Sequence, residues 1–335
     1  MGFRNLPMRT LLLLLLLPLL PLASASAEVS EIKIAKGFGL SYLQFVVMEH
    51  EKLIEKHAKA AGLDGLTADW AFVGSGTAAN EALLTGNLHF VSGGPPTALI
   101  LWDKTRGGIK MVSAMSQMPA YLNTRNPNVR TLRDFTTADR IALSAIKTAV
   151  QAVTLQMAAE QVFGVGHHEQ LDGLTVTLSN PDGMAAMLSG TEVTSHFTAP
   201  PYSTLELERP GVHKVLSSYD VLGGPSTYIV TWSSARFREE NPKAFKAFVD
   251  AFSEATDIIN QDKRHAAEIY RAGSQTNETF EDIMKLLDDP EIVFAMAPKN
   301  LMKYADFLHR TGVIKQQPAS WRDFFFPEIQ DRQGS

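Results

Sequence analysis

Glycines that follow a strand can bind phosphate groups, and Gly74, Gly76 and Ala79 form one such pattern. It fits the loose dinucleotide fingerprint G-x-G-x-x-A and follows a strand-like segment at residues 69–73. The helical pattern behind it ends after about two turns, which is short for a dinucleotide-binding unit. The acidic candidate, Asp103, follows a second strand–helix unit and a tryptophan. We therefore interpret the pattern as a plain glycine turn and expect no cofactor.

Other catalytic or metal-binding groups give weaker signals. His167, His168 and Glu169 could supply two metal ligands, but adjacent side chains diverge, and Gly164 and Gly166 indicate a solvent-exposed loop. The sequence has no G-x-S-x-G and no H-E-x-x-H motif. It also has no cysteine, which excludes a disulfide scaffold, a thiol nucleophile and an iron–sulfur cluster. We expect no catalytic residues and no metal.

The net charge and the N-terminal segment indicate which partners and which location to expect. The 335 residues carry a formal net charge of −5 and no basic stripe, so we expect no nucleic-acid partner. Arg4 and Arg9 precede the apolar run Leu11–Leu20, and small residues follow at 23–27. This pattern predicts a secretory signal peptide over residues 1–27, the alternative being an uncleaved membrane anchor. The remaining chain would be mildly acidic.

Strand-like and helix-like patterns alternate through the rest of the chain. Residues 31–35 alternate polar and apolar side chains, and 41–60 has helical spacing after a glycine turn. The same order recurs at 69–84 and at 89–102. Repeated βα units predict a mostly parallel sheet covered by helices on both faces.

A second block of the same kind lies in the middle of the chain. Two segments with a proline and an extended apolar run, Gln117–Thr124 and Gly223–Thr231, bracket it. They predict two crossings between an α/β lobe of residues 28–118 plus 226–335 and a second lobe of residues 119–225. A ligand cleft lies between lobes joined in this way, and we expect ligand to close them about these crossings. The long helical patterns at 242–261, 265–271, 278–287 and 300–311 should return to the first lobe.

One helix end favours anion binding. Residues 140–144 are strand-like, and Thr148 can cap a helix that runs to about Phe163. Its first amides, at Thr148, Ala149 and Val150, would face the cleft and bind an oxyanion, with Lys147 as a nearby charge. In the alternative interpretation, Thr148 only caps its own helix and Lys147 is solvated.

The order of these segments carries a resemblance. IKIAKGFGLSYLQFVVMEHEKLIEKHA, DWAFVGSGTAANEALLTGNLHFVSGGPPTALIL, TLRDFTTADRIALSAIKTAVQAVTLQMAAEQVFG and GMAAMLSGTEVTSHFTAPPYSTLEL resemble periplasmic solute-binding proteins of ABC importers of the nitrate, sulfonate and taurine type. The likeness covers nearly all of the chain after residue 27. It implies a type II periplasmic-binding fold, with two α/β lobes joined by two extended crossovers, and a function without chemistry.

Ligand-binding residues are expected where this fold places its cleft. The first lobe would supply Ser41 and Tyr42, Gly76 and Thr77, and Ser92 and Gly93, a set to which the resemblance also points. Aromatic residues near strand ends, which could instead plug the packing of a lobe, complete the set: Phe38, Tyr42, Phe197, Tyr202 and Tyr228.

The signal-peptide pattern predicts an extracytoplasmic protein, which we expect to be a monomer. The resemblance implies that it captures a small solute and delivers it to an ABC permease with its ATPase. The ligand class would be a sulfonate, nitrate, taurine or an aromatic carboxylate. Two alternatives remain open. One is an enzyme of the same fold resembling pyrimidine-precursor synthases, which the signal peptide and the lack of cysteines and clustered histidines disfavour. The other is a periplasmic sensor module.

Overall fold

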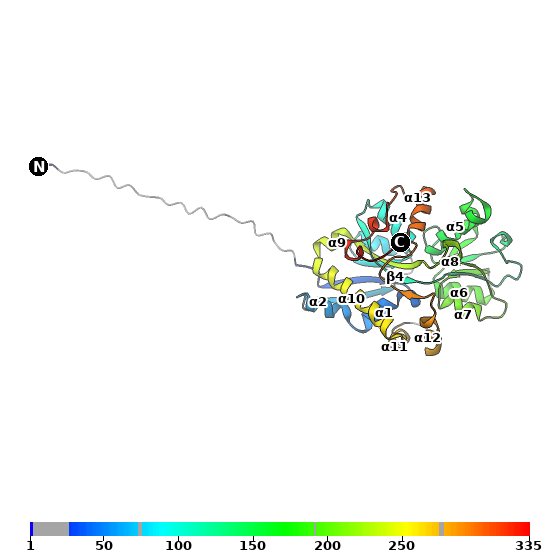
Figure 1. Ribbon diagram of the computed structural model, residues 1–335, viewed down its shortest axis with the longest axis horizontal. Coiled ribbons are helices and arrows are strands. Elements are labelled where there is room, and N and C mark those ends of the chain that lie inside the picture. The colour runs from blue at the N-terminus through cyan, green and yellow to red at the C-terminus, as the bar shows by residue number, and fades with distance from the viewer. Residues whose placement is uncertain (3–26, 73–75, 191, 275–277) are drawn as a thin grey trace.

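The computed structural model describes residues 1–2, 27–72, 76–190, 192–274 and 278–335, apart from the side chains of Gly76 and Thr77. In this part of the chain the longer strands form two sheets, and helices pack around each of them (Figure 1). Of the signal peptide predicted over residues 1–27, residues 3–26 lie outside the described residues, as do Val73, Gly74 and Ser75.

The strand order of the two sheets defines two lobes. Lobe 1 is built, among the described residues, on a six-stranded sheet in the order β11 (Val293–Phe294), β4 (Ile109–Gln117), β10 (Thr227–Ser234), β3 (Phe90–Gly93), β1 (Glu31–Lys36), β2 (Thr67–Phe72). Lobe 2 is built, over the same described ranges, on a five-stranded sheet in the order β7 (Thr175–Thr177), β6 (Ile141–Leu143), β8 (Ser195–Thr198), β5 (Tyr121–Thr124), β9 (His213–Ser217).

In both sheets most strands run in one direction, as the sequence predicted, but each sheet is mixed. β1 pairs in parallel with β2 and β3, and β6 pairs in parallel with β7 and β8. The strands next to the crossings run the other way: β10 is antiparallel to β3 and β4, and β5 is antiparallel to β8 and β9. A strand that enters a sheet directly from the other lobe, without a covering helix, is free to pair antiparallel.

The chain passes between the lobes at two places. It leaves the first sheet at the end of β4, at Gln117, and enters the second at the start of β5, at Tyr121. It returns through Gly223–Ser226 between α8 and β10. These positions coincide with the two segments in which the sequence combines proline with an extended apolar run.

Helices cover the sheets of both lobes (Figure 1). Those of lobe 1 are η1 (Leu40–Tyr42), α1 (Leu43–His50), α2 (Leu53–Ala60), α3 (Gly76–Leu84), α4 (Pro95–Lys104), α9 (Ala235–Glu240), α10 (Pro242–Gln261), α11 (Lys263–Gly273), α12 (Phe280–Asp288), α13 (Met302–Arg310), η4 (Trp321–Phe324) and η5 (Pro327–Ile329). Those of lobe 2 are η2 (Leu132–Asp134), α5 (Val150–Phe163), η3 (His168–Leu174), α6 (Asn180–Ser189), α7 (Tyr202–Leu207) and α8 (Ser218–Leu222).

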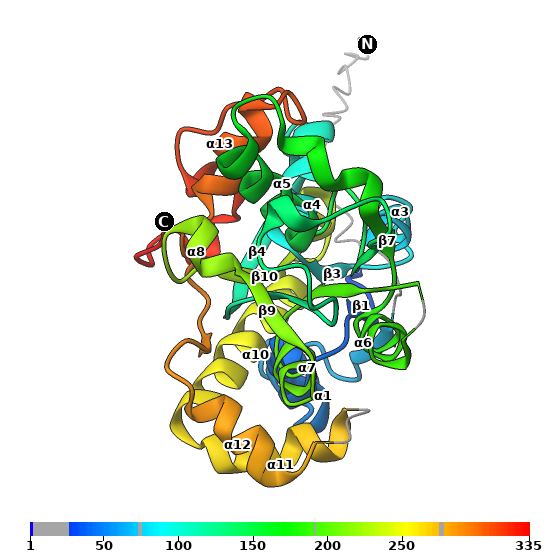
Figure 2. The same ribbon diagram turned by 90° about the vertical axis from the view of Figure 1, so that its right-hand side faces the viewer.

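The predicted long helices return to lobe 1. Helix α10 has the predicted bounds, and its buried residues, among them Phe245, Phe248 and Phe252, recur at the three- and four-residue spacing of one helix face. Phe45 of α1 meets Phe248 and Phe252 edge to face, with ring centroids 6.1 and 6.0 Å apart. Figure 2 shows α10 beside α1, with α11 and α12 beyond them. This aromatic packing holds the helical tail on the first sheet.

The helix predicted over residues 41–60 is interrupted. A 3-10 turn, η1, precedes α1, and α1 ends at His50. Lys52 adopts the left-handed conformation, with φ 54°, before α2 begins. Because neither glycine nor proline stands at this break, the sequence offers no local signal for it.

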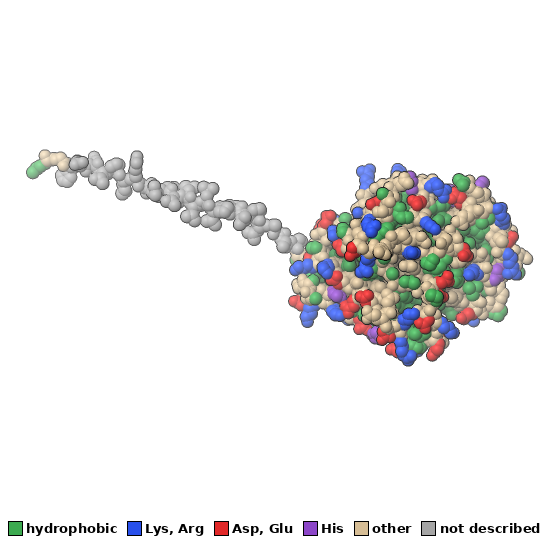
Figure 3. Space-filling view, in the orientation of Figure 1, with side chains coloured by type: hydrophobic (Ala, Val, Ile, Leu, Met, Phe, Trp, Pro, Cys, Tyr) green, Lys and Arg blue, Asp and Glu red, His purple; other side chains and the backbone are tan. Residues whose placement is uncertain are grey.

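No helix in the described ranges is both long enough and apolar enough to span a bilayer. On the face drawn in Figure 3, acidic and basic side chains are interspersed.

Candidate ligand-binding site

A cavity of about 110 Å³ lies where the two lobes meet. It is well below the roughly 300 Å³ at which drug-sized pockets begin, so it suits a ligand of a few non-hydrogen atoms. Eight of the residues named from the sequence line it: Phe38, Ser41, Tyr42, Ser92, Gly93, Ala149, Val150 and Tyr228. Further lining residues that the sequence did not single out include Lys36, Gly37, Gly94, Thr97, Ser144, Gln151, Ser179, Asn180 and Trp232.

The end of β1 and the turn η1 form one wall. The Tyr42 ring packs against Gly37 and leaves no room for a side chain there. A Cβ at Gly37 would stand 2.6 Å from the Tyr42 hydroxyl oxygen. Burial raises the pKa of Tyr42 far above its ordinary value. The phenol therefore stays protonated at physiological pH and can donate a hydrogen bond.

Lys36 is the one lining residue with a charged side chain in the described part of the chain. It is 5% exposed and pairs with Glu49 of α1, whose side chain is 38% exposed. Its ammonium nitrogen also lies 4.8 Å from the centroid of the Phe72 ring, on which Phe38 stacks. Lys36 lines the cavity and Glu49 does not, so a ligand meets the positive end of this ion pair.

The β3–α4 turn brings the lobes into contact at the cavity. Ser92 donates its hydroxyl hydrogen to the Ala35 carbonyl oxygen at 2.8 Å, which joins the ends of β3 and β1. A Cβ at Gly94 would stand 2.7 Å from Cβ of Val150 in lobe 2. The hydroxyl of Thr97 donates to the Thr148 carbonyl oxygen at 2.9 Å. Gly94 thus permits a backbone approach that any larger residue would block.

The N-terminus of α5 faces the cavity without a side-chain cap. Ala149 is the N-cap residue and offers no side-chain oxygen, so the prediction that Thr148 caps this helix was wrong. Ala149, Val150 and Gln151 all line the cavity. The amides of Thr148 and Ala149, predicted as anion donors, instead donate to the Ile146 and Ala145 carbonyl oxygens at 2.9 and 3.2 Å. Val150 and Gln151 begin the helix, and the first amides of a helix, which lack partners inside it, favour an oxyanion together with the helix dipole.

Lys147 does not supply the nearby charge predicted for it. It adopts a left-handed φ of 65° and its ammonium group lies 3.4 Å from Glu169, with both side chains more than 60% exposed. Among the described residues, the charged side chain that lines the cavity is Lys36 of lobe 1.

A chain of hydrogen bonds crosses the cavity wall. Ser144 donates its hydroxyl hydrogen to Oε1 of Gln151 at 3.2 Å, and Nε2 of Gln151 donates to the Tyr228 hydroxyl oxygen at 2.8 Å. Ser144 and Gln151 belong to lobe 2, whereas Tyr228 belongs to β10 of lobe 1. Burial raises the pKa of Tyr228 well above its ordinary value, and the neighbouring Tyr42 and Tyr304 add to this.

The remaining predicted residues lie elsewhere. Phe197, on β8, is fully buried in the core and does not line the cavity. Tyr202 lies outside it, near Gly39, and burial raises its pKa to about 12. Thr148 reaches the site through its backbone alone, by the bond from Thr97. Gly76 and Thr77 begin α3, whose Ala79 lines the cavity, but their side chains lie outside the described residues.

Metal ligation finds no support in the residues described. They contain no group of three or more His, Asp or Glu side chains that could hold a metal ion. His167 and Glu169 are exposed at the start of η3, and the His168 ring packs edge to face on Phe307 at 5.8 Å.

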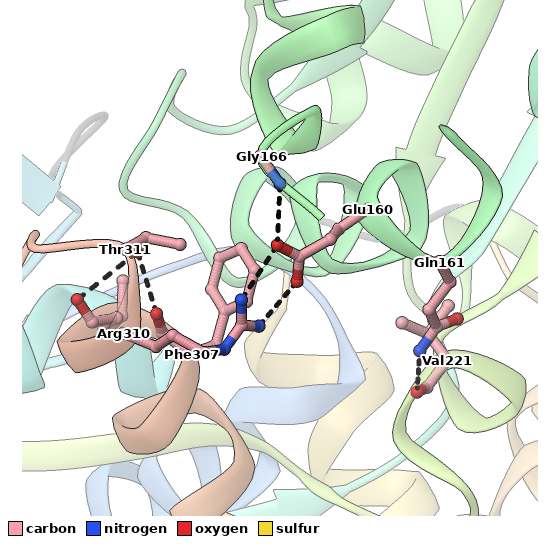
Figure 4. Close-up of polar contacts among 8 residues, drawn as sticks. Glu160, Gln161, Gly166, Val221, Phe307, Arg310 and Thr311 are labelled. Carbon is pink, nitrogen blue, oxygen red and sulfur yellow. Dashed lines mark hydrogen bonds and ion pairs between the residues drawn. The ribbon is translucent and has the colours of Figure 1, made fainter. Parts of the chain in front are cut away.

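A second contact joins the lobes away from the cavity, between α5 and α13 (Figures 1 and 2). Figure 4 shows the Arg310 guanidinium of α13 facing the Glu160 carboxylate of α5. The buried hydroxyls of Thr154 and Tyr304 lie 2.9 Å apart on the same two helices. Helix α5 therefore contacts lobe 1 near its start, in its middle and near its end, through Val150, Thr154 and Glu160.

Structural comparison shows which fold this is. The alkanesulfonate-binding protein SsuA from Xanthomonas axonopodis pv. citri, solved bound to MOPS, is 13% identical, with a TM-score of 0.68 over 90% of this chain and 99% of that one. The periplasmic aliphatic sulphonate binding protein SsuA from Escherichia coli is 16% identical, with a TM-score of 0.64 over 92% and 96%. The periplasmic nitrate-binding protein NrtA from Synechocystis PCC 6803 is 14% identical, with a TM-score of 0.67 over 88% and 84%.

These similarities confirm the periplasmic-binding fold expected from the sequence. Comparison with curated proteins gives no significant match. A family model, by contrast, matches residues 25–272, which is most of the chain and includes the strands and helices that line the cavity. The chain belongs to the NMT1-like family.

Proposed function

We propose that this protein binds a small organic anion outside the cytoplasm and delivers it to the permease of an ABC importer. The observation that carries the proposal is the uncapped N-terminus of α5, which faces a small cavity between two lobes. The family and the fold support a solute-binding function, because the similar structures are named as sulfonate- and nitrate-binding proteins. The export pattern over residues 1–27 supports the location.

The cavity supports an anion over a cation or a neutral solute. Helix amides and dipole contribute about 0.3 to 1 kcal/mol to a bound anion, and up to about 2 kcal/mol when it is partly buried. Lys36 adds a positive charge from the opposite wall. Tyr42, Tyr228 and Trp232 give the cavity apolar faces, which suits an organic group attached to the anion. Sulfonates and carboxylates of a few non-hydrogen atoms match both features.

A thermal-shift screen tests this proposal, with purified protein that has first been unfolded and then refolded. Refolding matters because a ligand carried through purification would hide the response. Methanesulfonate, taurine, nitrate and benzoate are the probes. Ammonium serves as the cationic comparison and neutral sulfones as the uncharged comparison. A ligand at a hundredfold excess over its dissociation constant stabilises the fold by about 2.7 kcal/mol. A response to cations alone, or to none of these probes, would contradict the proposal.

Ala149→Asp links the screen to the site. Aspartate is a favourable N-cap residue, so the variant should keep or gain stability, while its carboxylate occupies the amides that would bind the ligand. We expect the thermal shift with anions to disappear. Ala235→Asp, which makes the same change in the first turn of α9, is the matched control and should respond like the wild type. An unchanged response in Ala149→Asp would exclude this helix end as the anion site.

A further inference from the structure

The hydrogen-bond chain at the cavity wall has a direction. Oε1 of Gln151 accepts from Ser144, so the amide nitrogen faces Tyr228 and donates to the phenol oxygen. The phenol oxygen uses a lone pair for this bond and keeps its own hydrogen. Within the described ranges no residue accepts that hydrogen. Tyr228 lines the cavity and is only 5% exposed, so its hydroxyl has few alternatives to a bound ligand.

We propose that Tyr228 donates its hydroxyl hydrogen to an acceptor oxygen of the ligand, and that Gln151 is the positioning residue that turns this hydrogen toward the cavity. The inference rests on the proposed function and names the chemistry of its site. Buried polar groups without partners destabilise a complex, so a ligand must present an oxygen here. Sulfonates and carboxylates qualify, whereas a ligand that presents an ammonium or amide hydrogen at this point is rejected.

The same bond links ligand recognition to the relative position of the lobes. Gln151 stands at the start of α5 in lobe 2, and Tyr228 stands on β10 in lobe 1. When the lobes separate, the bond between them breaks and the phenol is free to turn. The hydrogen is therefore presented in the required direction only when the lobes are together, so tight binding and closure depend on each other.

Calorimetry with methanesulfonate, which has acceptor oxygens and no donor, tests the assignment. Tyr228→Phe keeps the ring and removes the hydroxyl, and we expect affinity to fall by about 10- to 100-fold, as for a hydrogen bond to a charged group. Tyr202→Phe, outside the cavity, is the matched control and should bind like the wild type. Equal affinity of Tyr228→Phe and wild type would overturn the assignment.

A double-mutant cycle tests the positioning role of Gln151. Gln151→Met removes the bond that orients the phenol and should weaken binding by a few-fold, less than the loss of the hydroxyl itself. In the Tyr228→Phe background the same change should have almost no effect, because no hydrogen remains to be oriented. Additive losses in the double variant would overturn the positioning role. Thermal unfolding of each variant checks that the fold is retained.

One outcome separates this inference from the proposed function. If methanesulfonate binds the wild type and Tyr228→Phe equally, the inference fails and the anion-binding function stands. If no probe in the wider screen binds, the proposed function fails with it.

Discussion

Arg310 and Glu160 form a two-armed ion pair that ties the lobes together, with Nη1–Oε1 and Nη2–Oε2 distances of 2.9 and 2.6 Å. Arg310 ends α13 of lobe 1, and Glu160 lies in the last turns of α5 in lobe 2. The cavity lies at the other end of α5, about 15 Å away for ten residues of helix. Because a bidentate pair is stronger than a single hydrogen bond, this contact adds a restraint on separation of the lobes about the two crossings.

Loss of this ion pair should loosen the closed arrangement. In Glu160→Gln, the neutral amide cannot accept both arms of the guanidinium as a charged partner does. We expect a larger radius of gyration in small-angle scattering without ligand. Glu240→Gln, which removes an exposed pair with Arg236 within lobe 1, is the control and should scatter like the wild type. A scattering curve of Glu160→Gln identical to that of the wild type would show that the pair does not restrain the lobes.

The same pair predicts a dependence of stability on pH. Hydrogen bonds from Arg310 lower the pKa of Glu160, burial opposes them, and the Gly166 amide assists. A carboxylate with a lowered pKa in the folded state contributes stability above its unfolded pKa, about 4.3, and loses it as the pH falls through the folded value. Denaturant unfolding should therefore show a wild-type advantage over Glu160→Gln at neutral pH that shrinks below this point. An advantage that grows on acidification would contradict this assignment.

Gly94 offers a test at the opposite end of α5. A methyl group there would meet the Val150 side chain and backbone at 2.7 and 2.9 Å, so Gly94→Ala must push α4 and α5 apart. Overpacking of this kind typically destabilises by about 1 to 3 kcal/mol. We expect weaker methanesulfonate binding by calorimetry and a larger radius of gyration. Gly173→Ala, where nothing lies within 4 Å, is the control. Wild-type behaviour of Gly94→Ala would mean that this approach of the lobes is not needed for binding.

Local patterns predicted the elements better than their pairing. The helical pattern predicted at 242–261 coincides with α10, whose buried Phe245, Phe248 and Phe252 lie on one face, because helical periodicity is local to the chain. Strands β4 and β9 were not predicted as separate elements, and the sequence did not show that β5 and β10 run opposite to their neighbours. Their direction depends on how the crossings enter each sheet, and no residue within the strand encodes that.

The site shows the same division. Tyr228 and Phe197 are both strand aromatics, yet the first lines the cavity and the second fills a core, because alternate residues of a strand face opposite sides of a sheet. Gln151 acquires its role from Tyr228, which is 77 residues away. In the sequence Lys36 is only a lysine at the end of a strand, and its contacts with Glu49 and Phe72 arise from the fold. Partners so distant in sequence leave no spacing signal in a single chain.

Lys36 gives the last prediction, which concerns the charge of the ligand. Lys36→Met keeps the length of the side chain and removes the cation, while Glu49, partly exposed, remains hydrated. We expect affinity for methanesulfonate to fall by about tenfold or more, which corresponds to about 1.4 kcal/mol or more. Binding of dimethyl sulfone, which has similar oxygens and no charge, should not weaken. Lys33→Met changes a lysine of the same strand that is 42% exposed and pairs with Glu31, so it is the matched control. Because the Lys36 charge is nearly buried, added salt should screen its effect only weakly. Equal losses for the sulfonate and the sulfone would assign Lys36 to packing and remove it from charge selection.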